Sequence, residues 1–204
     1  MNDLTVVPTG VANLASVRAA FARLGCALVA ARQPQDVADA AAVLLPGVGH
    51  FGEARAALDA RGLAAPLRQR LRDGRATLGI CLGMQLCCEG SDEAPQTPGL
   101  GAVPGRVTRF PSAVRCPQMG WNDVACAGDT TLLEPGHAYF ANSFRLCEPP
   151  AGWAVATAEH GGTYVAALER GAVLLCQFHP ELSAGYGEAL LRRWLQRAAA
   201  EVAC

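Results

Sequence analysis

The segment Gly79-Ile80-Cys81-Leu82-Gly83-Met84-Gln85 joins a short apolar run to a helical pattern. Residues 76–80 are predicted to form a buried strand, and a helix is predicted to begin near Leu82. Cys81 is therefore expected on the tight turn between them, where Gly79 and Gly83 remove side chains that would collide. This arrangement is typical of a nucleophile elbow, with sulfur in place of oxygen. An isolated motif of this kind is more often a buried structural cysteine.

Upstream of this turn, short apolar runs alternate with amphipathic helical segments. Strands are predicted at residues 4–8, 27–31 and 42–45. Helices are predicted from Leu14 to about Leu24, capped by Asn13 and ended by Gly25, and over residues 63–72. Strands that alternate with helices predict parallel βαβ units.

Downstream of the turn the pattern changes. Residues 91–105 are rich in proline and glycine and are predicted to form a loop. From Val107 to Gln177, short apolar segments predict antiparallel strands, and a final helix is predicted over residues 188–200. The turn signals between these strands lie at residues 127–129, 134–136, 149–150 and 160–162. We therefore expect one α/β domain over residues 1–204.

The composition excludes several classes of protein. Hydrophobic residues make up 51% of the chain and charged residues 17%, which is not the composition of a disordered protein. The net charge of -1 and the absence of a basic block argue against a nucleic-acid-binding surface. All 17 basic residues are arginine, so no lysine can form a Schiff base or bind phosphate in a P-loop.

The apolar runs and the cysteines bear on location and metal content. No apolar run reaches the roughly 18 residues of a membrane span, and the first residues lack the positive region of a signal peptide. The nine cysteines form no C-x-x-C pair and have no histidine partners at zinc-binding spacing. Neither disulfides nor a metal site is expected, and thiols at this density suit a reducing compartment. The sequence therefore predicts a cytoplasmic protein.

A second motif, Gln177-Phe178-His179-Pro180-Glu181, follows a predicted strand over residues 172–176. Open α/β sheets place their sites at the carboxyl ends of strands. If the motif is extended, as Pro180 favours for the residue before it, His179 and Glu181 project to the same side. Glu181 would then hold the imidazole of His179 in one tautomer. Alone, such a motif is more often a surface turn, but it supplies the base that a cysteine nucleophile needs.

A third segment, Leu45-Pro46-Gly47-Val48-Gly49-His50-Phe51, also follows a predicted strand. The glycines on both sides of Val48 allow a peptide plane to turn and to offer an N–H group to a substrate oxygen. Taken by itself, this segment is more simply an ordinary strand-to-helix turn.

Together the three segments resemble the class I (triad-type) glutamine amidotransferases. The resemblance extends from about residue 4 to the final helix, and in detail the chain looks like the glutaminase subunits of imidazole glycerol phosphate synthases. The details are Pro46-Gly47-Val48-Gly49, Gln118-Met119-Gly120-Trp121-Asn122, Asn13-Leu14-x-Ser16-Val17, and Tyr139-Phe140 with Ser143. Two positions depart from that pattern, because Pro8-Thr9-Gly10 replaces Asp-Tyr-Gly and Asn142 replaces a histidine.

The resemblance implies a fold, an activity and a partner. The fold is a three-layer sandwich around a mainly parallel twisted sheet with an additional antiparallel section. The activity is hydrolysis of glutamine to glutamate and ammonia through a cysteine thioester, with no cofactor and no metal, in histidine biosynthesis. The ammonia would pass to a (βα)8-barrel cyclase, the heterodimer partner, which makes imidazole glycerol phosphate and aminoimidazole carboxamide ribotide. The free subunit is then expected to be nearly inactive.

The resemblance also implies roles for individual residues. The expected catalytic residues are Cys81, His179 and Glu181. The expected oxyanion-hole residues are Leu82, Val48 and Gly49. The expected substrate-binding residues are Gln85, Gly47, Asn142 and Ser143. The expected partner-contact residues are Met119, Trp121, Asn122 and Tyr139, although Trp121 could instead be a core aromatic residue.

Three other functions stay open at this point. The chain could supply ammonia to another acceptor synthase, as in pyridoxal phosphate, anthranilate or GMP synthesis, but the motifs at residues 46–49 and 119–122 argue against it. It could be an inactive relative that only binds a partner, but the three intact triad residues argue against that. A standalone thiol hydrolase would act without a partner and without a strict preference for glutamine.

Overall fold

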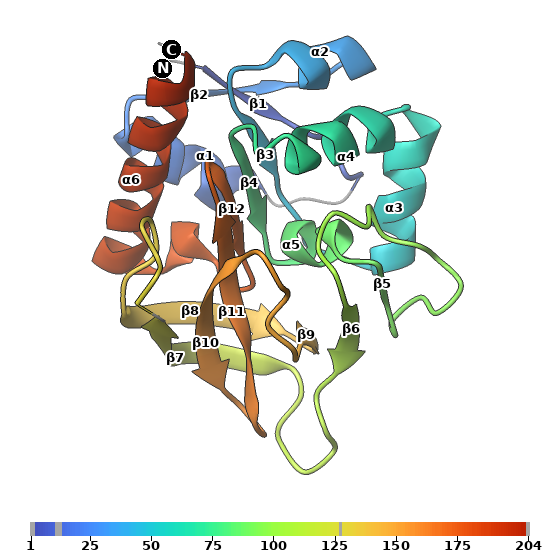
Figure 1. The fold of residues 1–204 in the computed structure, drawn as a ribbon, viewed down its shortest axis with the longest axis vertical. Coiled ribbons are helices and arrows are strands. Elements are labelled where there is room, and N and C mark those ends of the chain that lie inside the picture. Colours follow the sequence, from blue (N-terminus) through green and yellow to red (C-terminus); the bar gives the residue numbers. More distant parts are fainter. Residues whose placement is uncertain (1–2, 11–13, 127, 203–204) are drawn as a thin grey trace.

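The strands of the computed structural model form two sheets within the described residues 3–10, 14–126 and 128–202 (Figure 1). The larger sheet contains, in spatial order, β2 (Ala27–Ala30), β1 (Asp3–Val6), β3 (Val43–Leu45), β4 (Thr77–Ile80), β12 (Val173–Cys176), β11 (Thr163–Arg170), β10 (Ala154–Glu159), β7 (Gln118–Cys126) and β8 (Gly136–Asn142). The smaller sheet contains β5 (Gly90–Ser91), β6 (Arg106–Arg109) and β9 (Phe144–Leu146).

The direction of the strands changes halfway across the larger sheet. Neighbouring strands from β2 to β12 are parallel. Neighbouring strands from β12 to β8 are antiparallel. The expected α/β fold, a parallel sheet with an added antiparallel section, is confirmed.

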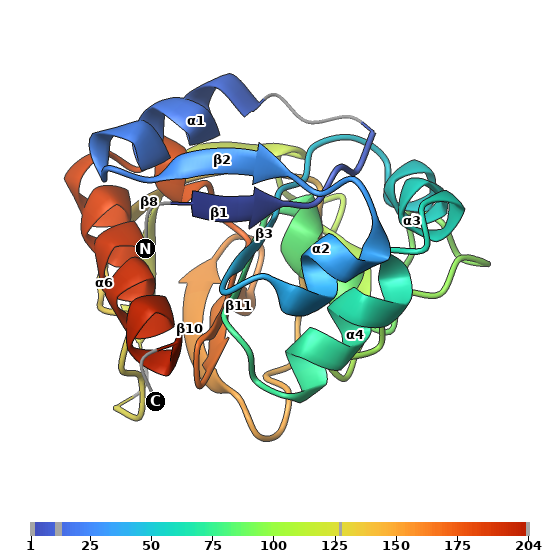
Figure 2. The same cartoon turned by 90° about the horizontal axis from the view of Figure 1, so that it is seen from above.

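Helices cover both faces of the sheet and make the fold three-layered (Figures 1 and 2). One face carries α1 (Leu14–Arg23) and α6 (Ala184–Val202). The other face carries α2 (Pro34–Asp39), α3 (Phe51–Ala60), α4 (Ala64–Arg72) and α5 (Leu82–Cys87). A short 3-10 helix, η1 (Pro180–Leu182), links the end of the sheet to α6.

The two faces of the sheet bury two separate hydrophobic clusters. On β3, Leu44 packs in the cluster that contains Trp194 of α6, whereas Val43 and Leu45 pack in the cluster that contains Leu58 of α3. All of these side chains are buried. Successive residues of a strand face opposite sides, so a strand covered on both sides is apolar throughout. This is why the central strands appear in the sequence as continuous apolar runs.

The predicted elements upstream of Cys81 agree with the structure to within two residues. The helices α2 and α3 are absent from the prediction because α2 has only six residues and α3 consists mainly of alanine and charged residues. The final helix begins at Ala184 rather than at residue 188, because Gly185 and Gly187 weaken the helical pattern. Gly187 is needed there, since a Cβ atom would lie 1.9 Å from the Pro180 carbonyl oxygen. The predicted cap Asn13 lies outside the described residues.

A buried carboxylate holds the connection between β7 and β8. Glu169 of β11 is 4% exposed. Its oxygens accept hydrogen bonds from the backbone N–H groups of Thr131, Leu132 and Leu133 and from the Thr131 hydroxyl. These bonds give partners to the buried carboxylate oxygens. They also give partners to backbone N–H groups that no strand pairs with.

We expect Glu169→Leu to lower the free energy of unfolding by about 3 kcal/mol, because it leaves several buried N–H groups without an acceptor. Glu169→Gln keeps one acceptor oxygen and should cost about half as much. Urea denaturation measures both losses, and Glu148→Leu, at an exposed glutamate, is the control. An unchanged denaturation midpoint in Glu169→Leu would contradict this role.

Candidate active site

Cys81 lies at the carboxyl end of β4, immediately before α5. Its backbone has φ 50° and ψ -109°, a region that side chains rarely occupy and that costs about 1–3 kcal/mol. Its N–H group donates to the Cys176 carbonyl oxygen at 2.7 Å, which ties the turn to β12. A Cβ atom on Gly83 would lie 2.0 Å from the Leu45 carbonyl oxygen, and one on Gly79 would lie 2.7 Å from Leu175. The predicted nucleophile elbow is present, and its glycines are sterically required.

His179 and Glu181 lie directly after β12, the neighbour of β4. The Nδ1 atom of His179 is 2.8 Å from Oε1 of Glu181, and both side chains are buried. The predicted contact is therefore present, but the extended geometry used to predict it is wrong. His179 is extended, whereas Pro180 begins the 3-10 helix η1, and a tight turn rather than strand alternation brings the carboxylate to the ring.

The charge of His179 is set by its two neighbours. Burial by itself lowers the pKa of His179, but the hydrogen bonds and charges of Cys81 and Glu181 outweigh burial and raise this pKa to about 10. The imidazole is therefore protonated at neutral pH. Cys81 and Glu181 thus both favour the charged ring, and the Nδ1 atom of the ring faces the Glu181 carboxylate.

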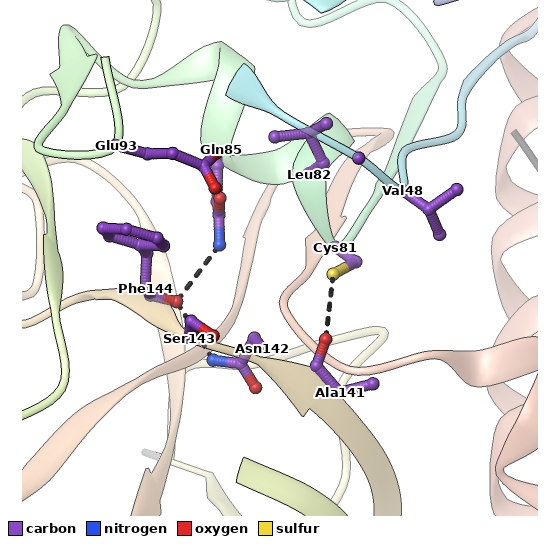
Figure 3. A pocket seen from close by; sticks show the side chains of 10 residues that line it. Val48, Cys81, Leu82, Gln85, Glu93, Ala141, Asn142, Ser143 and Phe144 are labelled. Carbon is purple, nitrogen blue, oxygen red and sulfur yellow. Dashed lines mark hydrogen bonds between the residues drawn. The ribbon is translucent and has the colours of Figure 1, made fainter. Parts of the chain in front are cut away.

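A cavity of about 180 Å³ opens in front of the Cys81 sulfur (Figure 3). The Sγ atom of Cys81 lies 3.9 Å from the Ala141 carbonyl oxygen at this cavity. Nine other residues line it; they are Val48, Gly49, Leu82, Gln85, Glu93, Ala141, Asn142, Ser143 and Phe144. The structure thus brings together the predicted nucleophile Cys81, all three predicted oxyanion-hole residues and three of the four predicted substrate-binding residues.

Two predicted substrate-binding side chains meet on one backbone carbonyl. The Phe144 oxygen accepts from Nε2 of Gln85 at 3.1 Å and from Nδ2 of Asn142 at 3.0 Å (Figure 3). Asn142 is 4% exposed, and its Oδ1 atom is buried with no protein partner. Two side-chain amides and a backbone carbonyl therefore form part of the cavity wall.

Gly47 does not line this cavity. It lies against the start of α5, where a Cβ atom would be 2.5 Å from the Gly83 backbone nitrogen. It borders a second, smaller hollow that also contacts His179 and Glu181. Close packing of the loop on α5 therefore requires a glycine at position 47. The prediction that Gly47 lines the substrate cavity is not borne out.

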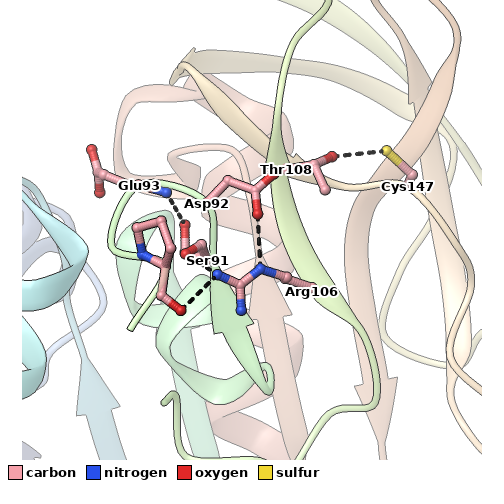
Figure 4. A network of polar contacts seen from close by, with 7 residues as sticks. Ser91, Asp92, Glu93, Arg106, Thr108 and Cys147 are labelled. Atoms are coloured by element: carbon pink, nitrogen blue, oxygen red, sulfur yellow. Dashed lines mark hydrogen bonds and ion pairs between the residues drawn. The ribbon is translucent and has the colours of Figure 1, made fainter. Parts of the chain in front are cut away.

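Glu93 is a cavity residue that sequence reasoning missed. Its Oε2 atom accepts from the Phe51 N–H group at 2.7 Å, at the start of α3. The segment around it is held by Arg106, which bonds Asp92 Oδ1 and the Ser91 carbonyl oxygen at 2.8 Å each (Figure 4). An acidic residue inside a loop rich in proline and glycine carries no local signal, and only the tertiary fold brings it to the cavity.

The residues predicted to contact a partner lie on the outer hairpin of β7 and β8. Met119 is 63% exposed and Trp121 is 49% exposed, so Trp121 is not a core residue. The Trp121 ring stacks on His137 at 5.9 Å and meets Tyr139 edge-on at 6.2 Å. Asn122 alternates to the opposite face of the strand, where its amide donates to the Glu159 carbonyl oxygen at 2.9 Å.

Backbone hydrogen bonds connect the strand that carries this exposed face to His179 and Ser183. The Tyr139 carbonyl oxygen accepts from the His179 N–H group at 2.8 Å, and the Tyr139 N–H group donates to the Ser183 hydroxyl at 3.0 Å. One hydrogen bond therefore joins the hairpin to the backbone of His179.

Within the part of the chain that the structure describes, no helix is long and apolar enough to cross a membrane. The same residues contain no group of three or more histidine, cysteine, aspartate or glutamate side chains that could hold a metal ion. The eight described cysteines are free thiols. Burial raises the pKa of the Cys87, Cys88 and Cys176 thiols, which makes these neighbours of the site poor nucleophiles.

Known proteins are similar to this chain over most of its length. A family model described as glutamine amidotransferase class-I matches residues 9–197. Imidazole glycerol phosphate synthase subunit HisH of Symbiobacterium thermophilum is 40% identical, over 95% of this chain and 93% of that protein. Subunit HisH 2 of Prochlorococcus marinus is 41% identical, over 94% and 93%. The chloroplastic synthase hisHF of Arabidopsis thaliana is 35% identical, but the match covers only 34% of its length.

Solved structures show the same fold at lower identity. A crystal structure of a glutamine amidotransferase has a TM-score of 0.77 at 23% identity, over 96% of this chain and 98% of that one. The structure of PurLQS from Thermotoga maritima has a TM-score of 0.70 at 17% identity, over 98% and 99%. The chain belongs to the class I glutamine amidotransferases and, within them, to the family of the HisH subunits of imidazole glycerol phosphate synthase.

Proposed function

We propose that the protein is the glutaminase subunit of an imidazole glycerol phosphate synthase. It hydrolyses the side-chain amide of glutamine to glutamate and ammonia. The observation that carries this proposal is the Cys81–His179–Glu181 arrangement at the mouth of a cavity with a glutamate and several amides in its wall.

The reaction proceeds through a thioester. The Cys81 thiolate attacks the side-chain amide carbon of glutamine, and the resulting oxyanion is met by N–H groups at Leu82 and in the Val48–Gly49 loop. The His179 imidazolium donates its proton to the amide nitrogen, the C–N bond breaks, and ammonia leaves. His179, now neutral, takes a proton from water, whose oxygen attacks the thioester and releases glutamate and the Cys81 thiolate.

The cavity wall supplies groups for the rest of the substrate. Glutamine carries an α-ammonium and an α-carboxylate at neutral pH. The Glu93 carboxylate, at one side of the cavity, suits the α-ammonium. The Gln85 amide and the backbone around Asn142 and Ser143 form another part of the wall and offer hydrogen bonds to the amide and the carboxylate of the substrate. Gly47 is not part of this pocket.

We propose a (βα)8-barrel cyclase as the heterodimer partner, with ammonia passing directly to it. The relatives are named as subunits of a synthase, and the Arabidopsis synthase continues far beyond the matched region. The exposed face of Met119, Trp121 and Tyr139 offers apolar anchors beside the active site. Docking at this face would adjust the oxyanion loop and His179, and the free chain would be slow. We place the complex in the cytoplasm.

Replacing Cys81 by alanine should abolish ammonia release, because no other described thiol lies in the cavity. The loss should exceed about a thousandfold, since the nucleophile is removed. Glutaminase assays with the barrel partner and its nucleotide ligand present measure it. Cys126→Ala, at a half-buried cysteine outside the cavity, is the control. Ammonia release at the parent rate by Cys81→Ala would disprove the mechanism.

Replacing Glu181 by glutamine should move the alkaline limb of the pH–rate profile to lower pH. The carboxylate raises the pKa of His179, so its loss lowers that pKa and removes the proton needed by the leaving ammonia at a lower pH. The rate should also fall about a hundredfold at neutral pH. The measurement is kcat/KM across the pH range, with Glu148→Gln as the exposed control. A profile that keeps its alkaline limb would show that Glu181 does not hold the charge of His179.

Replacing Trp121 by alanine should weaken the complex with the barrel partner by about 30-fold, as for an interface aromatic anchor. Calorimetry measures the affinity. Val29→Ala, at an equally exposed apolar residue on the edge strand β2, is the matched control. Unchanged affinity in Trp121→Ala would place the interface elsewhere, and full activity of the free chain would contradict activation by docking.

A further inference from the structure

Gln177 is a fully buried polar residue to which the mechanism above gives no task. It follows β12, and its backbone N–H group donates to the Ala166 carbonyl oxygen at 2.8 Å, so that the pairing with β11 continues past the end of the strand. Its exposed fraction is 0%, and its side-chain amide must therefore find partners inside the protein. Both partners belong to the active site.

The side chain of Gln177 connects the cavity wall to the nucleophile. Its Oε1 atom accepts from Nε2 of Gln85 at 3.0 Å. Its Nε2 atom donates to Sγ of Cys81 at 3.7 Å, a distance that suits the large sulfur atom. Gln85 itself donates from the same Nε2 atom to the Phe144 carbonyl oxygen at 3.1 Å. A continuous chain of hydrogen bonds therefore runs from the cavity wall to the reacting atom.

A backbone carbonyl sets the direction of this chain. The Phe144 oxygen can only accept, so the NH₂ group of Gln85 must point to it, and the second hydrogen of that group points to Gln177. The Gln177 amide then has its oxygen toward Gln85 and its NH₂ group toward Cys81. A reversed amide at Gln177 would bring two NH₂ groups together and would place an oxygen against the sulfur.

We propose that Gln177 is a positioning residue that holds the Cys81 sulfur as a hydrogen-bond acceptor and couples it to Gln85 in the glutamine cavity. A hydrogen bond to a charged acceptor is stronger than one to a neutral acceptor, so this N–H group favours the thiolate over the thiol. Binding of glutamine against Gln85 would then change the hydrogen bond that Gln177 donates to the Cys81 sulfur. The coupling to substrate rests on the proposed function, whereas the effect on the sulfur does not.

The test is the rate at which iodoacetamide alkylates Cys81 in the full chain without glutamine, followed by mass spectrometry across a range of pH. In Gln177→Met we expect alkylation to slow about tenfold at neutral pH, which corresponds to about 1.4 kcal/mol, and its pH profile to move to higher pH. Gln118→Met is the matched control, because Gln118 is also buried and its amide oxygen accepts from the Tyr164 hydroxyl at 2.8 Å. Its profile should equal that of the parent.

A double-mutant cycle tests the chain of hydrogen bonds. Gln85→Met alone should slow alkylation, because the Gln177 amide is then free to turn, but it should have no further effect in the Gln177→Met background. An unchanged profile in folded Gln177→Met, equal slowing in Gln118→Met, or additive effects of the two site variants would each overturn the proposal. If Gln177→Met does not fold, Gln177→Asn, whose amide is one methylene too short to reach the sulfur, carries the same expectation.

The two proposals can fail separately. If the parent chain with its barrel partner releases no ammonia but Gln177→Met still slows alkylation, the glutaminase function is wrong and the role of Gln177 stands. If the parent is an active glutaminase and Gln177→Met alkylates like the parent, only the role of Gln177 is wrong.

Discussion

The pairing of β4 with β12 is the constraint on which the rest of the site depends. The parallel register places Ile80 beside Cys176, and the Cys81 N–H group bonds the Cys176 carbonyl oxygen at 2.7 Å. Both strands therefore end at the same level of the sheet, and the residues that follow them meet. A shift by one residue would turn every side chain of β12 to the opposite face and would move His179 away from Cys81. Both strands are buried on both faces.

The backbone of Cys81 and the polar groups around its sulfur meet at this edge of the sheet. The left-handed backbone of Cys81 is possible only because Gly79 and Gly83 leave room for Leu175 and Leu45. The same turn exposes the sulfur to the cavity, to His179 and to the amide of Gln177. The strained backbone of this turn therefore fixes the position of the Cys81 sulfur.

The hairpin of β7 and β8 links the site to the outside of the molecule. The residues of β8 contribute to the cavity at Ala141 and Asn142, to the His179 backbone at Tyr139, and to the exposed face through the ring of the same Tyr139. Glu169 holds the connection between the two strands from the core side. One structural unit therefore joins the cavity to the exposed face that we propose as the docking site of a partner.

Local sequence was sufficient to predict those features of the fold and the site in which the backbone requires particular residue types. The central strands are apolar throughout, the elbow carries its two glycines, and the segment around His179 carries a proline and a glutamate. These features predicted the fold class and the candidate site of Cys81, His179 and Glu181. The same reasoning gave the contact between His179 and Glu181 for the wrong geometric reason, because Pro180 begins a 3-10 helix that the pattern does not distinguish from a strand. Neighbours far along the chain decided three further features. These are helix α3, the side of β7 on which Asn122 lies, and the packing role of Gly47. Glu93 and Gln177 became site residues only in the tertiary structure, because their partners Phe51, Gln85 and Cys81 lie many residues away and a buried amide or carboxylate carries no local signal of what it will meet.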